Sequence, residues 1–522
     1  MKDTEDDLRG VYIVYAVNRT LRKSWTLEKG VFMEIFGRSF SGVTNVTDNS
    51  REVVKGSLFI AIKGANFNGE SVAFEMLGRG AVAVISENDL GLGENQIVVP
   101  NARLAFAQAA SAFYKEPTSK LKLIAVTGTN GKSTVATLVK AIIDSKQGKC
   151  GFIGTTGNDT GLGMVSTNLT TPRQDELYRL FAEMVENGVE YCVMETSSQA
   201  LDQYRIANER FEIGVFTNLT QDHLDWHKTM ENYYQAKKRL FTMCKSAIVC
   251  IDDEWGTRLA SELKSDGEIP VITYSVKPKI GQIADYFAEK IKLNSDSISY
   301  WLSCTESEKS HSVKLSMPGL FNVANSIAAF IVCEKACDIS GGDCVKALAE
   351  CTGVRGRCEV IWSGDDYPTV ICDYAHTGDA LEKILTCINE FKNKAHNNAA
   401  KSGKIICVFG AAGERDADKR PEMGEIVARL ADELVITSDN PRFEDPEAII
   451  AEVMSGIAKI ELKRSKAFVL REKAIEYALS SATKDDIILL AGKGHETYQV
   501  IGDEEQPFDE REIVKVFYER TK

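Results

Sequence analysis

A glycine-rich turn followed by a lysine and two hydroxyl residues is the first stretch of this chain that could do chemistry. It reads TGTNGKST over residues 127–134 and follows the apolar run LIAV at 123–126. Glycines let backbone N–H groups approach a phosphate, and the start of a helix adds its positive end. We expect Lys132 to reach the β- and γ-phosphates of a nucleotide, and Ser133 or Thr134 to hold Mg²⁺.

The elements on either side of this turn must hold it in place. The apolar run before it predicts a strand that ends at Val126, and the stretch after it predicts a helix. One face of that helix is apolar and carries Val135, Leu138, Val139, Ile142 and Ile143. The spacing is shorter than GxxxxGK[ST], because Val126 stands where that pattern has its first glycine and Gly128 comes two residues later. A chance glycine-rich turn before a helix is the alternative.

Two further segments put polar side chains at the ends of apolar runs. VEYCVMETSSQAL (189–201) predicts a buried strand that ends at Glu195, where an acid could reach Mg²⁺ directly or through water. VFTNLTQDHLDWH (215–227) repeats the design and includes His223 and His227. A lone histidine is often structural, so His227 is open to both interpretations.

The last third of the chain contains four polar clusters, each at the predicted carboxyl end of a strand. In a doubly wound sheet those ends form one crevice. Aspartate caps, glycine turns and a proline stop could explain each cluster separately, but their coincidence at one edge favours a shared ligand. The clusters are DYAHTGDAL (373–381), GAAGERDADKRPEM (410–423), SDNPRFEDP (438–446) and AGKGHETY (491–498).

The length of 522 residues exceeds what one hydrophobic core organises. Short strand-like runs such as SLFIAI (57–62) and AVAVIS (81–86) come first, and strands alternating with helices begin at residue 121. That alternation predicts a parallel sheet. A Gly/Arg-rich joint, GVRGR (353–357), precedes a second α/β series. We therefore expect an α/β chain with three domains, at 1–115, 116–354 and 355–522.

Charge and cysteine usage limit the classes of partner and compartment. The net charge of −13 argues against a broad surface for nucleic acid or an anionic membrane. The 13 cysteines form no CxxC pair, which favours the reduced thiols of a cytosol. The N-terminus does not look like a signal peptide, and no run approaches ~18 apolar residues. We expect a soluble cytoplasmic protein that does not insert into a membrane.

The motifs together resemble the Mur ligases, over about residue 45 to the end. The resemblance implies an N-terminal α/β nucleotide-sugar domain, a central P-loop-type ATPase domain with a parallel sheet, and a C-terminal Rossmann-like domain. It also implies ATP-dependent joining of an amine to a carboxylate through an acyl phosphate. The motifs occur in family order: TGTNGKST, TTPRQDEL, DHLD, ENYYQAKKRLF, GVRGRCEVI, DYAHTGDAL, GERDADKRP, DNPR and GKGHE.

The resemblance also implies roles at the nucleotide and metal positions. ATP contacts fall on Gly128, Thr129, Asn130, Gly131, Lys132, Ser133, Thr134, Arg357 and Asp373. Mg²⁺ ligands fall on Ser133, Glu195, His223 and Lys237, and catalytic roles on Lys132, Lys237 and His223. Adjacent lysines on a helix are typical of a solvated face, but the resemblance implies that Lys237 is carbamylated and helps to hold a second magnesium ion.

The substrate with the carboxylate is, by the same resemblance, a UDP-MurNAc-dipeptide. Its contacts fall on Ser50, Thr170, Thr171, Ser197 and Arg205. Pro172 is expected to begin a helix, and a plain helix cap followed by proline is the alternative reading of this segment. Near Ser50 the chain has Asn49 where the family usually has aspartate.

The DNPR loop resembles the selector for the incoming amino acid in the members that add meso-2,6-diaminopimelate. This diamino acid differs from lysine by a second carboxylate, which an arginine fork can pair bidentately. Contacts with the amino acid fall on Arg415, Asn440, Arg442, Gly492 and Glu496, with Glu496 facing an ammonium group. The expected partners are therefore three small molecules, ATP, the UDP-MurNAc-dipeptide and a diamino acid, and we expect a monomer.

Four other functions remain open from the sequence. The first is the same reaction with L-lysine, and the second is a folylpolyglutamate synthetase, against which the DNPR and GKGHE loops argue. The third is a P-loop nucleotide-binding regulator that ligates nothing, and the fourth is a small-molecule kinase. Phosphate release that depends on the amino acid separates the ligase from the regulator.

Overall fold

This computed structural model describes residues 31–64, 67–167, 169–206, 209–276, 278, 283–293, 297–351, 353–395 and 403–520. They separate into two units. The first contains the described residues among 1–119, 173–182 and 203–208, and the second contains Lys120–Pro172, Glu183–Asp202 and the described residues from Glu209 onward. The start of the predicted domain at 1–115, before Val31, lies outside the described residues.

The first unit is built on a four-stranded parallel sheet with the order β3-β4-β5-β6. Its strands are β3 (Asn45–Thr47), β4 (Ser57–Ile60), β5 (Ala83–Ser86) and β6 (Gln96–Val98). A hairpin of β1 (Val31–Ile35) and β2 (Arg38–Val43) precedes the sheet, and helices α2 (Ala73–Gly78) and α3 (Ala102–Phe113) pack on it. All residues of β4 and β5 are buried, which confirms the strands predicted at SLFIAI and AVAVIS.

The second unit begins with an eleven-stranded sheet of order β10-β9-β8-β11-β7-β12-β13-β14-β15-β16-β17. The strands from β8 to β15 in that order are parallel, and the strands at both ends are antiparallel. The strands are β7 (Lys122–Thr127), β8 (Cys150–Gly154), β9 (Gly157–Asp159), β10 (Met164–Val165), β11 (Tyr191–Glu195), β12 (Ile213–Phe216), β13 (Ala247–Cys250), β14 (Val271–Ser275), β15 (Tyr286–Leu293), β16 (Ile298–Cys304) and β17 (Ser307–Leu315).

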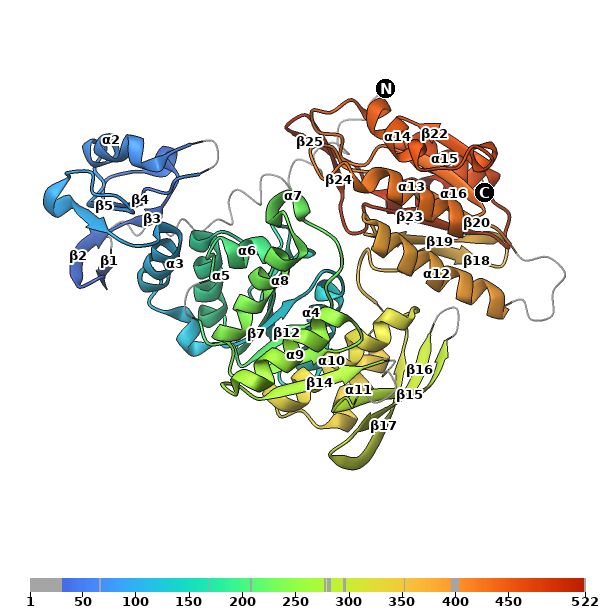
Figure 1. Cartoon of the computed structure of the whole chain (residues 1–522), viewed down its shortest axis with the longest axis horizontal. Coiled ribbons are helices and arrows are strands. Elements are labelled where there is room, and N and C mark those ends of the chain that lie inside the picture. The colour runs from blue at the N-terminus through green and yellow to red at the C-terminus, as the bar shows by residue number, and fades with distance from the viewer. Residues whose placement is uncertain are drawn as a thin grey trace, which may run out of the picture. The chain divides into compact units, whose positions relative to one another are not determined.

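Helices connect and cover these strands (Figure 1). They are α4 (Lys132–Lys146), α6 (Ser198–Asp202), α7 (Leu224–His227), α8 (Met230–Lys238), α9 (Glu254–Asp266), α10 (Leu320–Ala336) and α11 (Gly341–Glu350). Helix α5 (Gln174–Glu186) is divided between the two units after Ala182. The face predicted for the helix after the glycine-rich turn is fully buried in α4, where it packs against β8, β11 and helix α10. This packing fixes the start of α4 at the carboxyl end of β7.

A six-stranded sheet of order β18-β19-β23-β20-β21-β22 follows, parallel except for the pair β18–β19. Its strands are β18 (Glu359–Gly364), β19 (Tyr367–Asp373), β20 (Ile405–Phe409), β21 (Glu433–Thr437), β22 (Ser465–Phe468) and β23 (Ile487–Ala491), and a hairpin adds β24 (Tyr498–Ile501) and β25 (Glu504–Pro507). The helices are α12 (Gly378–Ala395), α13 (Lys419–Leu430), α14 (Pro446–Ser455), α15 (Arg471–Ser481) and α16 (Glu510–Arg520).

Alternate residues of these strands enter two separate cores. Cys407 and Phe409 of β20 pack with residues of α12, α13 and α14, whereas Ile406 and Val408 pack with residues of α15 and α16. Both faces of the sheet are therefore covered, as in a doubly wound fold. The carboxyl ends of β19, β20, β21 and β23 then lie along one edge, which is where the four polar clusters begin.

Each of the 13 cysteines lies in a described segment and carries a free thiol. Among the described helices, none combines the length and apolar composition needed to cross a bilayer.

Candidate active site

The glycine-rich turn joins β7 to α4 with two glycines in backbone conformations that disfavour other residues. Gly128 has φ of +147° and Gly131 has φ of +88°. A Cβ on Gly128 would collide with the hydroxyl of Thr217, and one on Gly131 would lie 2.5 Å from Oδ1 of Asn325. The loop is therefore pressed against β12 and α10, and only glycine fits at these two points.

Two lysines converge on one carbonyl of this loop. Nζ of Lys132 donates to the carbonyl oxygens of Gly128 at 3.0 Å and Thr129 at 2.8 Å. Nζ of Lys237 donates to the same Gly128 oxygen at 2.8 Å. Burial lowers the pKa of both lysines, and Glu195 opposes that shift at Lys132. A neutral carbonyl only weakly compensates two amines, so an anion such as a phosphate would find favourable charge here.

Lys237 and Lys238 differ sharply in environment. The Lys237 side chain is 1% exposed, and its amine lies 4.6 Å from the ring centroid of Tyr233. Lys238 is partly exposed and pairs with Glu262 at 2.9 Å. The structure therefore places Lys237 against the phosphate loop, and only Lys238 fits the solvated face that adjacent lysines usually indicate.

Glu195 is completely buried at the end of β11 and accepts hydrogen bonds from two hydroxyl groups. Its Oε2 accepts hydrogen bonds from Oγ of Ser133 at 2.9 Å and Oγ1 of Thr155 at 3.0 Å. The Ser133 hydroxyl in turn accepts a bond from Nη2 of Arg357 at 3.1 Å. The described residues contain no group of three or more His, Cys, Asp or Glu side chains that could hold a metal. The carboxylate and hydroxyl oxygens of Glu195 and Ser133 nevertheless fit Mg²⁺, which prefers oxygen ligands and keeps several waters.

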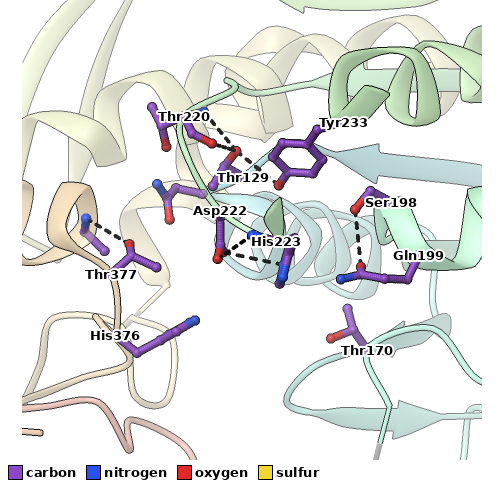
Figure 2. A network of polar contacts seen from close by, with 12 residues as sticks. Thr129, Thr170, Ser198, Gln199, Thr220, Asp222, His223, Tyr233, His376 and Thr377 are labelled. Atoms are coloured by element: carbon purple, nitrogen blue, oxygen red, sulfur yellow. Dashed lines mark hydrogen bonds and ion pairs between the residues drawn. The ribbon is translucent and has the colours of Figure 1, made fainter. Parts of the chain in front are cut away.

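The loop after β12 brings a histidine and an acid beside the phosphate loop (Figure 2). His223 has φ of +54°, and its Nε2 lies 3.5 Å from Oδ2 of Asp222. Burial and the nearby Lys237 lower the pKa of His223 to about 4, although Asp222 opposes the shift. Burial raises the pKa of Asp222, but His223 and His376, which are positive when protonated at low pH, and Lys419 hold it at about 2. The imidazole is therefore neutral near pH 7, as a metal ligand must be.

His227 has structural partners. Its Nε2 lies 2.9 Å from Oγ of Ser198, and its ring stacks on Tyr233 with centroids 5.1 Å apart. The Tyr233 hydroxyl lies 3.3 Å from Oγ1 of Thr129 in the phosphate loop, a contact drawn in Figure 2. His227 thus packs against Tyr233, which in turn contacts the phosphate loop.

The TTP segment contacts the end of β11. Oγ1 of Thr171 donates to the carbonyl of Glu195 at 2.9 Å and accepts from the backbone N–H of Ser197 at 3.0 Å. Oγ1 of Thr170 lies 3.1 Å from Oγ1 of Thr155. Thr170, Thr171 and Ser197 therefore lie close to Glu195. Helix α5 begins at Gln174, two residues after the predicted start at Pro172.

The two remaining residues predicted for the dipeptide substrate belong to the first unit. Ser50 begins a short 3-10 turn, and its carbonyl accepts a bond from Nη1 of Arg79 at 3.0 Å. Arg205 donates to Oε1 of Gln203, and burial lowers its pKa to about 10.

Arg357 and Asp373 are close in the part of the chain after the Gly/Arg-rich joint. Asp373 is buried, and its carboxylate accepts backbone bonds from Cys358 at 2.6 Å and Ala375 at 2.8 Å. Burial raises the pKa of Asp373, while Arg357 opposes the shift. The Arg357 guanidinium carbon lies 4.7 Å from the ring centroid of Tyr374, next to Asp373. Asp373 thus orders the backbone that presents Arg357 to Ser133.

The loops predicted to bind the amino acid meet one another. Nδ2 of Asn440 donates to Oε2 of Glu496 at 3.1 Å. Nη1 of Arg442 donates to the carbonyl of Gly413, at 2.8 Å, in the loop that also carries the exposed Arg415. Burial raises the pKa of Glu496, against the effect of nearby Lys493. Gly492 lies at the end of β23 with φ of +113°.

Sequence reasoning missed several residues that the structure places in these contacts. Asn325 faces Gly131 from α10, and its signal is the pair of asparagines that it forms with Asn322 in a largely apolar helix. Oδ2 of Asp379 accepts from Nδ2 of Asn130 at 2.7 Å and from Oγ1 of Thr220 at 3.0 Å, although in sequence it looks like an acid in the first turn of a helix. Lys493 lies within GKGHE and was not assigned a role.

Comparisons with known proteins place the chain in a family. The family description "Mur ligase middle domain" matches residues 126–333, and "Mur ligase, glutamate ligase domain" matches residues 356–494. A protein of Caldanaerobacter subterraneus subsp. tengcongensis is 42% identical over 495 residues, covering 94% of this chain and 97% of that protein. One from Clostridioides difficile is 40% identical over 473 residues, covering 90% and 94%. Both are named UDP-N-acetylmuramoyl-L-alanyl-D-glutamate--2,6-diaminopimelate ligase. A solved structure titled with the same enzyme name has 31% identity and a TM-score of 0.64, covering 94% and 97%.

Proposed function

The chain belongs to the Mur ligase family, has its three-domain fold, and we propose that it adds 2,6-diaminopimelate to a muramoyl dipeptide. The reaction consumes ATP and joins the meso-diamino acid to the D-glutamate of UDP-MurNAc-L-Ala-D-Glu in peptidoglycan precursor synthesis. The observation that carries this proposal is the 42% and 40% identity to ligases of that name over at least nine-tenths of the chain. The contact between Asn440 and Glu496 adds support for the amino acid.

In the first step the side-chain carboxylate of D-glutamate attacks the γ-phosphorus of ATP. A P–O bond forms to the carboxylate as the bond to ADP breaks, which leaves an acyl phosphate and ADP. Lys132 exchanges its loop carbonyls for phosphate oxygens and, with the Gly128–Thr134 backbone, holds them in line. Arg357 adds a second cation next to Ser133.

Magnesium fits this step, with Ser133 and Glu195 holding one ion and His223 and Lys237 helping to hold a second. Bound Mg²⁺ would supply positive charge to the phosphate oxygens. A carbamylated Lys237 would present an oxygen in place of an amine, which suits such a site. The burial of Lys237 beside Gly128 supports this assignment.

In the second step the amine of diaminopimelate attacks the acyl carbon. A tetrahedral intermediate forms, phosphate leaves with the C–O electron pair, and the amine loses a proton to give the amide. Arg442 and Arg415 would pair with carboxylates of the amino acid, with Asn440 beside them. Glu496 would pair with the ammonium at its far end, near Gly492. Water must be excluded here, because it would hydrolyse the acyl phosphate.

Other parts of the proposal concern the remaining substrate and the organisation of the chain. Ser50, Thr170, Thr171, Ser197 and Arg205 would hold the UDP-MurNAc-dipeptide. The domains would span 1–115, 116–354 and 355–522, and the enzyme would work as a cytoplasmic monomer. Asp373 would lie near the nucleoside of ATP.

The rival functions are not favoured. A folylpolyglutamate synthetase or a regulator without ligase activity does not account for relatives that carry one ligase name over nearly the whole chain. L-Lysine is the closest alternative substrate, and the DNPR loop separates it from the diacid, since lysine would leave Arg442 without a carboxylate partner.

The test is ATP-dependent phosphate release with UDP-MurNAc-L-Ala-D-Glu, comparing meso-diaminopimelate with L-lysine. We expect at least about a 100-fold preference for the diacid in kcat/KM, largely lost in Arg442→Ala. Arg429→Ala is the matched control, because Arg429 is an exposed arginine of the same sheet domain, paired with Glu382. Equal or better activity with lysine would overturn the diacid assignment, and no activity with either amino acid would overturn the ligase.

A further inference from the structure

Lys493 is a fully buried residue of the GKGHE loop at its contact with the DNPR loop, and both loops carry predicted amino-acid contacts. Its side chain is 0% exposed. Nζ donates to Oδ1 of Asn440 at 2.6 Å and to Oε2 of Glu496 at 2.8 Å, and it lies 3.8 Å from Oδ1 of Asp439. A buried ammonium is costly unless it is paired and hydrogen-bonded, and here it has both kinds of partner.

The contacts around Lys493 form a closed ring. Lys493 bonds to Asn440 and to Glu496, and Asn440 bonds to Glu496 through Nδ2 at 3.1 Å. Oδ1 of Asn440 also accepts the backbone N–H of Val500 at 2.9 Å. The acceptor oxygen of Asn440 therefore has two donors within the protein. Oε1 of Glu496 has no hydrogen-bond partner among the described residues, so that oxygen can meet a substrate.

Backbone hydrogen bonds and a close approach at Gly492 also connect the segments around this ring. The N–H of Arg442 donates to the carbonyl of Val500 at 3.2 Å, and Gly502 donates back to Arg442 at 2.9 Å. A Cβ on Gly492 would lie 2.5 Å from Oδ2 of Asp439. The DNPR loop, the GKGHE loop and the hairpin β24–β25 thus pack as one block around Lys493.

Lys493 also balances negative charge. Glu496 is faced by Lys493, Asp439, Tyr374 and Tyr498. Burial and Asp439 raise the pKa of Glu496, whereas Lys493 opposes both effects. Without the lysine, Glu496 would bind a proton at higher pH and could no longer pair with an ammonium group.

We propose that Lys493 is a positioning residue for amino-acid selection, which fixes Asn440 and Glu496 in one arrangement and keeps the Glu496 carboxylate available to the ammonium end of the diamino acid. This inference rests on the proposed function and adds a residue that does not itself touch the substrate. It makes the selectivity of the site depend on an ion pair inside the protein as well as on Arg442.

Lys493→Met tests the inference, and Lys473→Met is its matched control. Lys473 also pairs with a glutamate three residues later, Glu476 at 2.6 Å, but its side chain is 60% exposed. In Lys493→Met we expect KM for diaminopimelate to rise about 10- to 100-fold. The KM values for ATP and the UDP-dipeptide should stay within about twofold, as should all constants of the control.

A pH profile separates positioning from a merely structural role. The acid limb of kcat/KM for diaminopimelate should move to higher pH in Lys493→Met, because Glu496 then requires a higher pH to be charged. Lys493→Arg keeps the positive charge, so its acid limb should stay near that of the parent enzyme. If Lys493→Met does not fold, as judged by thermal unfolding, Lys493→Arg is compared in the same way with Lys473→Arg. Its KM for diaminopimelate should then rise selectively, because the larger planar group cannot reproduce the ring of contacts.

The double variant Lys493→Met/Glu496→Gln tests whether Lys493 acts through Glu496. If Lys493 acts through Glu496, the double variant should be no worse than the worse single variant. Unchanged KM for diaminopimelate, or equal losses with all three substrates, would overturn the inference while leaving the ligase proposal intact. Absence of product from the unaltered enzyme with diaminopimelate would instead overturn the proposed function.

Discussion

Lys132 and Lys493 lie at the carboxyl edges of two parallel sheets, but their ammonium groups have different kinds of partner. Lys132 donates to backbone carbonyls of Gly128 and Thr129, four and three residues away in its own loop. Lys493 donates to the Glu496 carboxylate and to the Asn440 amide, the latter 53 residues away. An ammonium group is attracted more strongly to a carboxylate than to a neutral carbonyl. Lys132 can therefore exchange its partners for phosphate oxygens, whereas Lys493 is suited to keep its partners.

Lys237 extends the comparison. It shares the Gly128 carbonyl with Lys132, so the phosphate edge carries two amines on one neutral acceptor. The amino-acid edge has the opposite ratio of charges, because the single amine of Lys493 faces two carboxylates, those of Asp439 and Glu496. At the first edge the two amines bond to neutral carbonyls, which phosphate oxygens of a nucleotide can replace. The second edge holds a carboxylate for a cationic substrate group.

The largest effect should come from Lys132→Met, which removes the amine that exchanges its loop carbonyls for phosphate oxygens. We expect kcat for phosphate release to fall about 10²- to 10³-fold, because charge on the transferring phosphoryl group loses a fixed cation. Binding of the UDP-dipeptide, measured by calorimetry, should be unchanged. Lys146→Met at the other end of α4, where Lys146 pairs with Asp343, is the control. A loss below tenfold would show that Lys132 keeps its loop contacts during turnover.

A smaller effect is expected from Glu195→Gln, which keeps the shape of the buried carboxylate and removes its charge. The Mg²⁺ concentration for half-maximal activity should rise at least about tenfold, because a charged oxygen ligand is lost. Chelation of Mg²⁺ should abolish activity of the unaltered enzyme. An unchanged Mg²⁺ requirement in the variant would remove Glu195 from the metal site and leave it as the residue that orders Ser133 and Thr155.

The sequence predicted the phosphate edge better than the amino-acid edge, and for a physical reason. The turn at 127–134 and the apolar face of α4 are local, so spacing alone placed Lys132 after β7. Lys237 and Lys238 could not be separated by periodicity, since burial depends on Gly128, which is 109 residues from Lys237. Only the family resemblance singled out the first of the two.

The amino-acid loops show more clearly what sequence spacing cannot predict. Asn440 was predicted to face the amino acid, but its amide bonds to Lys493, Glu496 and Val500, residues 53 to 60 positions away. No spacing within the DNPR loop reveals such partners, because they lie in the loop after β23, which β20 separates from β21 in the sheet, and in the hairpin strand β24. Fold class followed from alternation of strands and helices, whereas these contacts follow from tertiary packing.

The smallest effect is expected at Asp379, which connects the phosphate loop to α12. Its Oδ2 accepts from Asn130 at 2.7 Å, Thr220 at 3.0 Å and Lys383 at 2.8 Å. Asp379→Ala removes a carboxylate shared by three donors, but its side chain is 28% exposed, so water can replace part of what is lost. We expect a decrease of about 3- to 10-fold in kcat/KM for ATP, measured by phosphate release, with selectivity between diaminopimelate and lysine unchanged.

Glu382→Ala is the matched control for Asp379→Ala, because Glu382 lies one turn further along α12 and pairs with the exposed Arg429. Glu382→Ala should alter neither kcat/KM for ATP nor the selectivity between diaminopimelate and lysine. If Asp379→Ala changed the preference between diaminopimelate and lysine, the two edges would be coupled through α12, and the contrast between an exchanging Lys132 and a fixed Lys493 would no longer describe independent sites. If it changed kcat/KM for ATP alone, Asp379 would belong to the phosphate edge, and selection would depend only on the block around Lys493.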